Sequence, residues 1–166
     1  MGHFTLTITI DRPLGAVFAY VAEPSNMPLW YSAVDDVLTN GPPRSGARFR
    51  MTRTLPGGAV ANVVEVTEFD PPRRLTLESI SGPTPFRYAY DFKPANHGTT
   101  VTLTGRISSE GLPGPAGLLG ALATGLFARG MTHNLRSLKA QLESASHVTI
   151  VSDEDRLLRQ RSAGWD

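Results

Sequence analysis

The feature that most constrains the fold is a run of strand-like segments between residues 47 and 108, separated only by short breaks. The segments span residues 47–54, 59–67, 74–81, 86–92 and 100–108. The breaks at 55–58, 70–72, 82–85 and 95–98 are rich in glycine, proline, aspartate and asparagine, which are turn-forming residues. Connections this short do not hold a crossover helix, so the pattern predicts an antiparallel meander.

Alternation within these segments assigns every side chain to one of two faces. Three pairs set the predicted register: Thr54–Ala59, Ser81–Phe86 and Phe92–Val101. They place Tyr88 opposite Gly105 and beside Ser79. One face is then apolar, with Phe49, Met51, Val64, Leu77, Phe86, Tyr88, Tyr90, Phe92, Val101, Leu103 and Ile107. The other is polar, with Arg48, Arg50, Thr52, Glu65, Thr76, Glu78, Arg87, Asp91, Thr100, Thr102, Thr104 and Arg106. A slip of one residue would exchange the faces, so the pattern specifies the register.

Helical periodicity supplies the elements that cover the apolar face. Residues 4–10 alternate as an opening strand, residues 13–22 and 27–30 have the pattern of two short helices, and 33–39 that of a further strand. Residues 115–146 are the long helical candidate, with an apolar stripe of Met131, Leu135, Leu138 and Leu142. The predicted class is α+β: a curved antiparallel sheet of about six or seven strands wrapped around one long C-terminal helix.

Length and composition limit the organisation and the chemistry. A chain of 166 residues fits one domain, predicted over residues 1–146, with a polar tail at 147–166 that is either disordered or adds an edge strand at 148–151. The net charge of +1 argues against nucleic-acid binding, and the absence of Cys excludes disulfides and cysteine zinc sites. The four His lack ligand spacing, so no metal is predicted. Neither a targeting signal nor a transmembrane segment is evident, so we expect a cytoplasmic protein.

Several local motifs resemble the START-like, or SRPBCC, superfamily, whose members share the helix-grip fold. The motifs lie at residues 13–18, 30, 46–49, 66–75, 98–101 and 135–143. The resemblance covers roughly residues 3–146 and is closest to the polyketide cyclase/dehydrase branch. It implies a cavity between the apolar face of the sheet and the long helix.

The sequence indicates small side chains on both walls of that cavity. Gly105 lies opposite Tyr88, and Gly120 and Thr124 project to the same side of the helix as Met131. The predicted ligand-binding residues are Trp30, Tyr31, Phe49, Met51, Arg53, Asn62, Val64, Leu77, Ser79, Tyr88, Tyr90, Leu103, Gly105, Gly120, Thr124, Phe127 and Met131. The alternative is that Trp30, Phe127 or Tyr88 fills the space as ordinary core.

Arg53 and Tyr88 are the candidate catalytic residues. Arg53 lies in the inward register near Asn62, where a cation is costly unless it is paired. It either holds a carboxylate or enolate oxygen of a ligand or extends past the hairpin into water. Tyr88 either donates to a substrate carbonyl or packs its ring in the core. Trp30 and Tyr31 are expected at the cavity mouth.

A leucine-rich segment conflicts with a straight helix. Leu118, Leu122 and Leu126 lie on the side opposite Met131, and Gly125 and Gly130 weaken the helix. Either the helix is hinged near Gly125–Gly130 and the first segment forms a lid, or the leucines form a surface for a homodimer or a protein partner.

Three functions follow as hypotheses. The first is a binding module for a small hydrophobic ligand, lipid-like or polyketide-like. The second is a polyketide cyclase, aromatase or dehydratase that uses the same cavity without a cofactor. The third is a protein-binding adaptor that uses the leucine surface.

Overall fold

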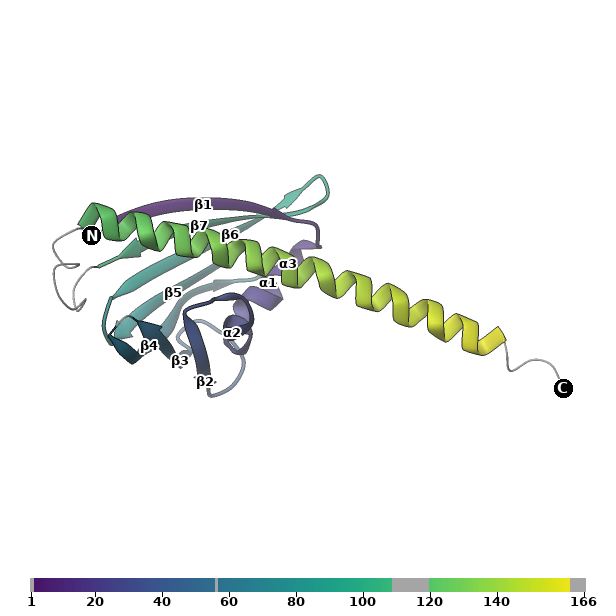
Figure 1. The fold of residues 1–166 in the computed structure, drawn as a ribbon, viewed down its shortest axis with the longest axis horizontal. Helices are drawn as coiled ribbons and strands as arrows, with labels where there is room; N and C mark the ends of the chain where they lie inside the picture. The colour runs from purple at the N-terminus through teal and green to yellow at the C-terminus, as the bar shows by residue number, and fades with distance from the viewer. Residues whose placement is uncertain (1, 56, 109–119, 162–166) are drawn as a thin grey trace.

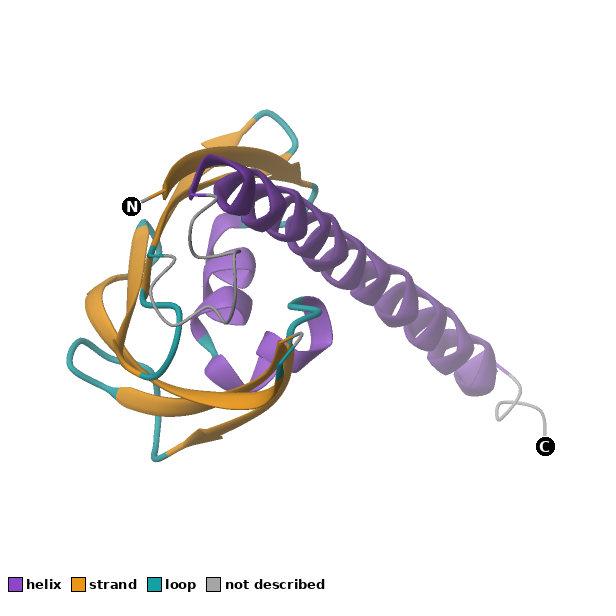
Figure 2. Ribbon diagram, turned by 60° about the vertical axis from the view of Figure 1, so that its left-hand side comes forward, coloured by secondary structure: helices purple, strands orange, loops and turns teal. Residues whose placement is uncertain are grey.

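The computed structural model describes residues 2–55, 57–108 and 120–161, and in these ranges it has the predicted helix-grip architecture. The strands are β1 (Gly2–Ile10), β2 (Val34–Thr39), β3 (Arg48–Leu55), β4 (Gly58–Asp70), β5 (Arg74–Ser81), β6 (Phe86–Ala95) and β7 (Gly98–Ile107). They form one antiparallel sheet in the order β1-β7-β6-β5-β4-β3-β2. The helices are α1 (Leu14–Ala22), the 3-10 turn η1 (Pro24–Asn26), α2 (Met27–Trp30) and α3 (Gly120–Arg161). The sheet curves around one side of α3, and α1 and α2 lie within the curve (Figures 1 and 2).

The register confirms two of the three predicted hairpins and corrects the third. Thr54 pairs with Ala59 and Tyr88 with Gly105, as expected. The predicted pairing of Ser79 with Tyr88 is wrong by two residues, because Leu77 pairs with Tyr88 and the β5–β6 ladder ends at Glu78–Arg87. Beyond that point β5 is paired only with β4, through Ser79–Val64 and Ser81–Val63. A wide turn separates the strands there: Gly82 and Thr84 have positive φ, and Pro83 and Pro85 have no N–H to donate.

The predicted division of the sheet into two faces holds with one exception. All eleven side chains assigned to the apolar face are buried. The exception is Thr76, assigned to the polar face but fully buried. A register shift between Val66 and Glu68 pairs Thr76 with Glu68, and the Thr76 hydroxyl donates to Glu68 Oε2 at 3.0 Å.

Helix α3 is a single uninterrupted helix, so the predicted hinge and lid near Gly125–Gly130 are wrong. A Cβ at Gly125 or at Gly130 would meet open space, so nothing packs there to force a bend. The helix also continues past residue 146, which excludes the edge strand at 148–151. Among the described residues, no helix has the length and apolar character needed to cross a bilayer.

The leucine surface is described only in part. Leu126 is 68% exposed, in agreement with its predicted outward orientation. Leu118 lies outside the described residues, as does the side chain of Leu122. A homodimer or partner surface at these leucines stays a prediction.

Apolar packing and polar contacts both fix α3 on the sheet. Met131, Leu135, Leu138 and Leu142 are buried, as the stripe predicts. At the far end of β1, Lys139 Nζ donates to the carbonyl oxygen of Thr9 and pairs with Glu143 at 2.7 Å. Glu143 Oε1 also accepts from the backbone N–H of Asp11 at 3.0 Å.

This contact predicts a small pH-dependent contribution to stability. The hydrogen bond from Lys139, followed by that from the Asp11 N–H, lowers the pKa of Glu143. A lowered folded-state pKa gives stability that is present above the unfolded pKa and is lost as pH falls through the folded value. Glu143→Gln should reduce the free energy of unfolding at neutral pH by less than about 1 kcal/mol, since the pair is partly exposed.

Urea unfolding measured at several pH values checks this prediction. The difference in the free energy of unfolding between Glu143→Gln and wild type should shrink as pH falls through the folded-state pKa of Glu143 and vanish below it. Asp36→Asn, at an exposed carboxylate on β2, is the matched control and should change the free energy of unfolding at neutral pH by no more than about 0.5 kcal/mol. A difference that persists undiminished in acid would contradict the assignment.

Candidate functional site

The site begins with Arg53 on β3, a cation that is 3% exposed. Its Nε and Nη2 donate to Asn62 Oδ1 at 3.1 and 2.6 Å. Nη2 also donates to the Pro83 carbonyl at 3.1 Å and the Thr84 hydroxyl at 2.7 Å. The guanidinium lies 5.7 Å from the centre of the Phe86 ring. Arg53 is therefore buried, and the prediction that it extends into water is wrong.

Asn62 on β4 completes this network. It is fully buried, and its Nδ2 donates to the Ser79 hydroxyl and to the carbonyl oxygens of Ser81 and Pro83 at 2.9–3.2 Å. Neutral oxygens thus satisfy the Arg53 cation, and no described Asp or Glu forms an ion pair with it. The network joins β3, β4 and the β5–β6 turn.

A second group of polar atoms lies deeper on the concave face. The hydroxyls of Tyr31 and Tyr88 are 3.4 Å apart and both residues are buried. Trp30 packs on Tyr31 with ring centres 5.9 Å apart. In the described part of the chain, the Trp30 indole N–H and the Tyr90 hydroxyl are buried without a hydrogen-bond partner. Trp30, Tyr31, Tyr88 and Tyr90 are called the interior cluster below.

Burial keeps the phenols of the interior cluster protonated. It is the main cause that raises the pKa of Tyr31, Tyr88 and Tyr90. The Tyr31 hydroxyl raises the pKa of Tyr88 and Tyr90 further, whereas the charge of Arg53 lowers that of Tyr31 and Tyr88. The charge of Arg53 thus acts against the effect of burial on the pKa of both Tyr31 and Tyr88. The interior cluster therefore presents donors to anything bound beside it.

The predicted open space at Gly105 is occupied. A Cβ at this position would clash with the ring of Phe4, which is the β1 partner of Gly105. Phe4 also lies 6.2 Å from the ring of Tyr88. The absence of a side chain at residue 105 thus accommodates an aromatic ring from the neighbouring strand.

The helix side of the predicted site is only partly assembled. Met131 is buried, and Phe127 packs partly buried against the core. Thr124 instead lies against Gly2 at the start of β1. Gly120 is the first residue of α3, and its surroundings lie outside the described residues. The cavity itself, and ligand binding by the residues predicted to line it, stay predictions.

The structure adds polar residues that the sequence reasoning missed. Asn134 is 2% exposed, and its Oδ1 accepts from the backbone N–H and the hydroxyl of Ser32 at 3.1 and 3.0 Å. It ties α3 to the segment after α2. Its position three residues after Met131 on the inward stripe could have revealed it. Thr84 had no such signal, because its contact with Arg53 depends on the shape of a turn.

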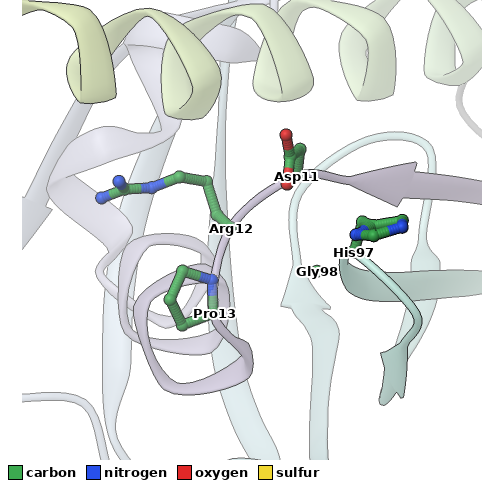
Figure 3. A pocket seen from close by; sticks show the side chains of 5 residues that line it. All are labelled: Asp11, Arg12, Pro13, His97 and Gly98. Atoms are coloured by element: carbon green, nitrogen blue, oxygen red, sulfur yellow. The ribbon is translucent and has the colours of Figure 1, made fainter.

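A surface pocket of about 330 Å³ lies away from the interior cluster. Figure 3 shows its lining: Asp11, Arg12 and Pro13 from the link between β1 and α1, His97 from the β6–β7 turn, and Gly98 at the start of β7. The two segments are in close contact, because a Cβ at Gly98 would clash with the Ile10 carbonyl oxygen. None of the predicted site residues lines this pocket.

Comparison with protein families gives a match over most of the chain. The family described as polyketide cyclase/dehydrase and lipid transport matches residues 1–143. Comparison with curated proteins gives no match.

Solved structures share the fold at low sequence identity. TTHA0849 from Thermus thermophilus is 21% identical with a TM-score of 0.74, covering 87% of this chain and 99% of that chain. A START superfamily protein from Mycobacterium smegmatis is 12% identical with a TM-score of 0.73 and the same coverage. The di-domain ARO/CYC BexL from the BE-7585A biosynthetic pathway is 22% identical with a TM-score of 0.67, covering 86% of this chain and 47% of that chain. At these identities the likeness establishes the fold alone.

Proposed function

Because the chain belongs to the polyketide cyclase/dehydrase and lipid transport family, we propose that it binds a small hydrophobic molecule between the concave face of the sheet and α3. The ligand is lipid-like or polyketide-like, with a largely apolar body and at least one acceptor oxygen. The interior cluster and Arg53 mark the place where that oxygen binds.

One observation carries this proposal: the buried Trp30 indole N–H and Tyr90 hydroxyl have no partner among the described residues. Folded proteins satisfy roughly 90% or more of their buried polar groups, so two orphans in one aromatic cluster call for a bound acceptor. The indole can only donate, and Tyr90 is held protonated by burial. A carbonyl, carboxylate or hydroxyl oxygen of a ligand supplies what both groups lack.

Native mass spectrometry of the protein purified from its own host tests the proposal directly. We expect a co-purifying small molecule that dissociates on denaturation. Protein that carries no such molecule, and that binds no fatty acid or polyketide in a Trp fluorescence titration, would overturn the proposal.

Tyr90→Phe tests the role of the orphan hydroxyl. Removing it should weaken binding of the co-purifying molecule by about 10-fold, the value of one hydrogen bond of about 1.4 kcal/mol. The free protein should be as stable as wild type or more so, because an unsatisfied buried hydroxyl is lost. Tyr20→Phe, outside the interior cluster, is the matched control and should leave binding unchanged. Equal affinities of Tyr90→Phe and wild type would remove Tyr90 from the site.

A second candidate is a polyketide cyclase, aromatase or dehydratase acting at the same place. The observation that favours it is the buried hydroxyl pair of Tyr31 and Tyr88 beside the charge of Arg53. Such a pair can donate to a ketone oxygen and stabilise the enolate formed during ring closure. The likeness to BexL, described as an ARO/CYC protein, supports the same direction.

Tyr88→Phe separates the two candidates. If the protein is an enzyme, this change should abolish turnover of a poly-ketone substrate and leave binding largely intact. Parallel loss of binding and turnover would favour simple binding. Arg53 stays in the proposal as a buried cation whose charge lowers the pKa of both tyrosines, although its truncation also removes structural contacts.

A further inference from the structure

The two arginines Arg87 and Arg106 lie directly opposite each other on β6 and β7. Like charges in this cross-strand position repel and destabilise a sheet. Little compensates the repulsion: Arg87 is 3.8 Å from the carboxylate of Glu78, beyond hydrogen-bond distance. In the described ranges, Arg106 has neither an ion pair nor a side-chain hydrogen bond. Its β1 partner is His3, which carries no negative charge.

The pair stands at a cleft that the β5–β6 register creates. β5 stays paired with β4 along its length but is no longer paired with β6 beyond Glu78, so a gap opens between β5 and β6. The gap is a cleft of about 180 Å³ lined by Glu78, Ser79, Pro85, Phe86, Arg87, Arg106 and Ser108. Phe86 is 6% exposed and forms an apolar wall, while the two guanidinium groups are at the polar side.

Other arginines on the same face behave differently. Arg48 and Arg74 form ion pairs with Glu65 and Asp91, each at 2.7 Å. Arg50 also has no ion pair among the described residues, but its cross-strand neighbours are Val63 and Leu38, so it meets no repulsion. Arg87 and Arg106, by contrast, lie opposite each other with one carboxylate, that of Glu78, 3.8 Å from Arg87, and both arginines line a cleft.

We propose that this cleft binds an oxyanion, a phosphate or carboxylate group held between Arg87 and Arg106. Two guanidinium groups on adjacent strands suit the several acceptor oxygens of such a group, and each contact is charge-assisted. The carboxylate of Glu78 lowers the net charge of the cleft to +1, from two arginines and one glutamate, and so favours a small anion over a large acidic surface. The site does not depend on the proposed interior ligand.

Titration with inorganic phosphate, followed by amide NMR shifts at constant ionic strength, tests the proposal. We expect saturable shifts at residues 86–87 and 106–108 that sodium chloride does not reproduce. Arg106→Thr should weaken phosphate binding by about 10-fold, the loss of one charge-assisted contact. Arg50→Thr, also an exposed arginine on a strand of this face, is the matched control and should bind as wild type does.

Thermal unfolding gives a second readout. Without phosphate, Arg106→Thr should melt at or above the wild-type temperature, because the repulsion is relieved. Phosphate should raise the melting temperature of wild type and of Arg50→Thr, but not that of Arg106→Thr. Equal responses of the two variants, or shifts that never saturate, would overturn the proposal.

A dodecyl phosphate arm distinguishes a free anion from the headgroup of a larger ligand. If the headgroup is the source, dodecyl phosphate should bind more tightly than phosphate and should also change the tryptophan fluorescence. If a free anion is the source, dodecyl phosphate should gain no affinity. Either source of the anion supports the proposed site. If dodecyl phosphate binding or the fluorescence change is lost in Tyr90→Phe but kept in Arg106→Thr, the phosphate binds at the interior cluster and the proposed site is wrong.

Discussion

Arg53→Ala should lower the free energy of unfolding by about 3–5 kcal/mol, the cost of removing one partner from a buried charged network. The change removes four hydrogen bonds and leaves Asn62 Oδ1 without its donor. The β5–β6 turn loses its attachment to β3 and β4. Urea unfolding at neutral pH measures the effect.

Two variants make this prediction specific. Arg50→Ala removes an exposed arginine of the same strand and should change stability by no more than about 0.5 kcal/mol. Arg53→Leu combined with Asn62→Leu should cost less than the sum of the single changes, because neither partner is left unpaired. A loss in Arg53→Ala no larger than that in Arg50→Ala would show that the network contributes nothing to folding.

Gly105→Val should destabilise the protein by about 1–3 kcal/mol, the usual cost of overpacking a core. The added side chain meets the ring of Phe4, which cannot move without leaving its contact with Tyr88. If the space at this position were open, Gly105→Val would instead raise the free energy of unfolding, because the valine would fill a void. Thermal or urea unfolding of Gly105→Val distinguishes destabilisation from stabilisation.

The control for Gly105→Val is a glycine with free space around it. Gly125 lies in α3 with nothing near its missing Cβ, so Gly125→Ala should stabilise the helix by about 1 kcal/mol. Combining Phe4→Ala with Gly105→Val should recover part of the loss, since the clash is removed. Stabilisation by Gly105→Val alone would mean that the concave face is open at this point.

The β5–β6 hairpin shows how far sequence reasoning reaches. Alternation assigned the correct face to Leu77, Tyr88 and Phe86, since a shift of two residues preserves parity. It could not predict the length of the turn. That length depends on Thr84 adopting a positive φ and on Arg53 holding it from another strand.

Arg53 shows the same limit of sequence-based prediction within the candidate site. The pattern identified it as an inward cation near Asn62, which the structure confirms. Its guanidinium donates to the protein's own oxygens rather than to water or a ligand. This depends on the carbonyl of Pro83 and the hydroxyl of Thr84, which are 30 and 31 residues away in sequence. No local pattern reports such a contact.

Periodicity alone was enough to predict the sheet, its two faces, the order of its elements and the stripe by which α3 is packed. A strand repeats every two residues and a helix every 3.6 whatever surrounds them, so these features can be read before the chain is folded. Three other features could not be predicted from the sequence. Phe4 covers Gly105, and α3 continues unbroken through Gly125 and Gly130. Trp30 and Tyr90 lack hydrogen-bond partners among the described residues. Packing and hydrogen-bond satisfaction are set by atoms brought together from distant parts of the chain, and their positions exist only once the chain has folded.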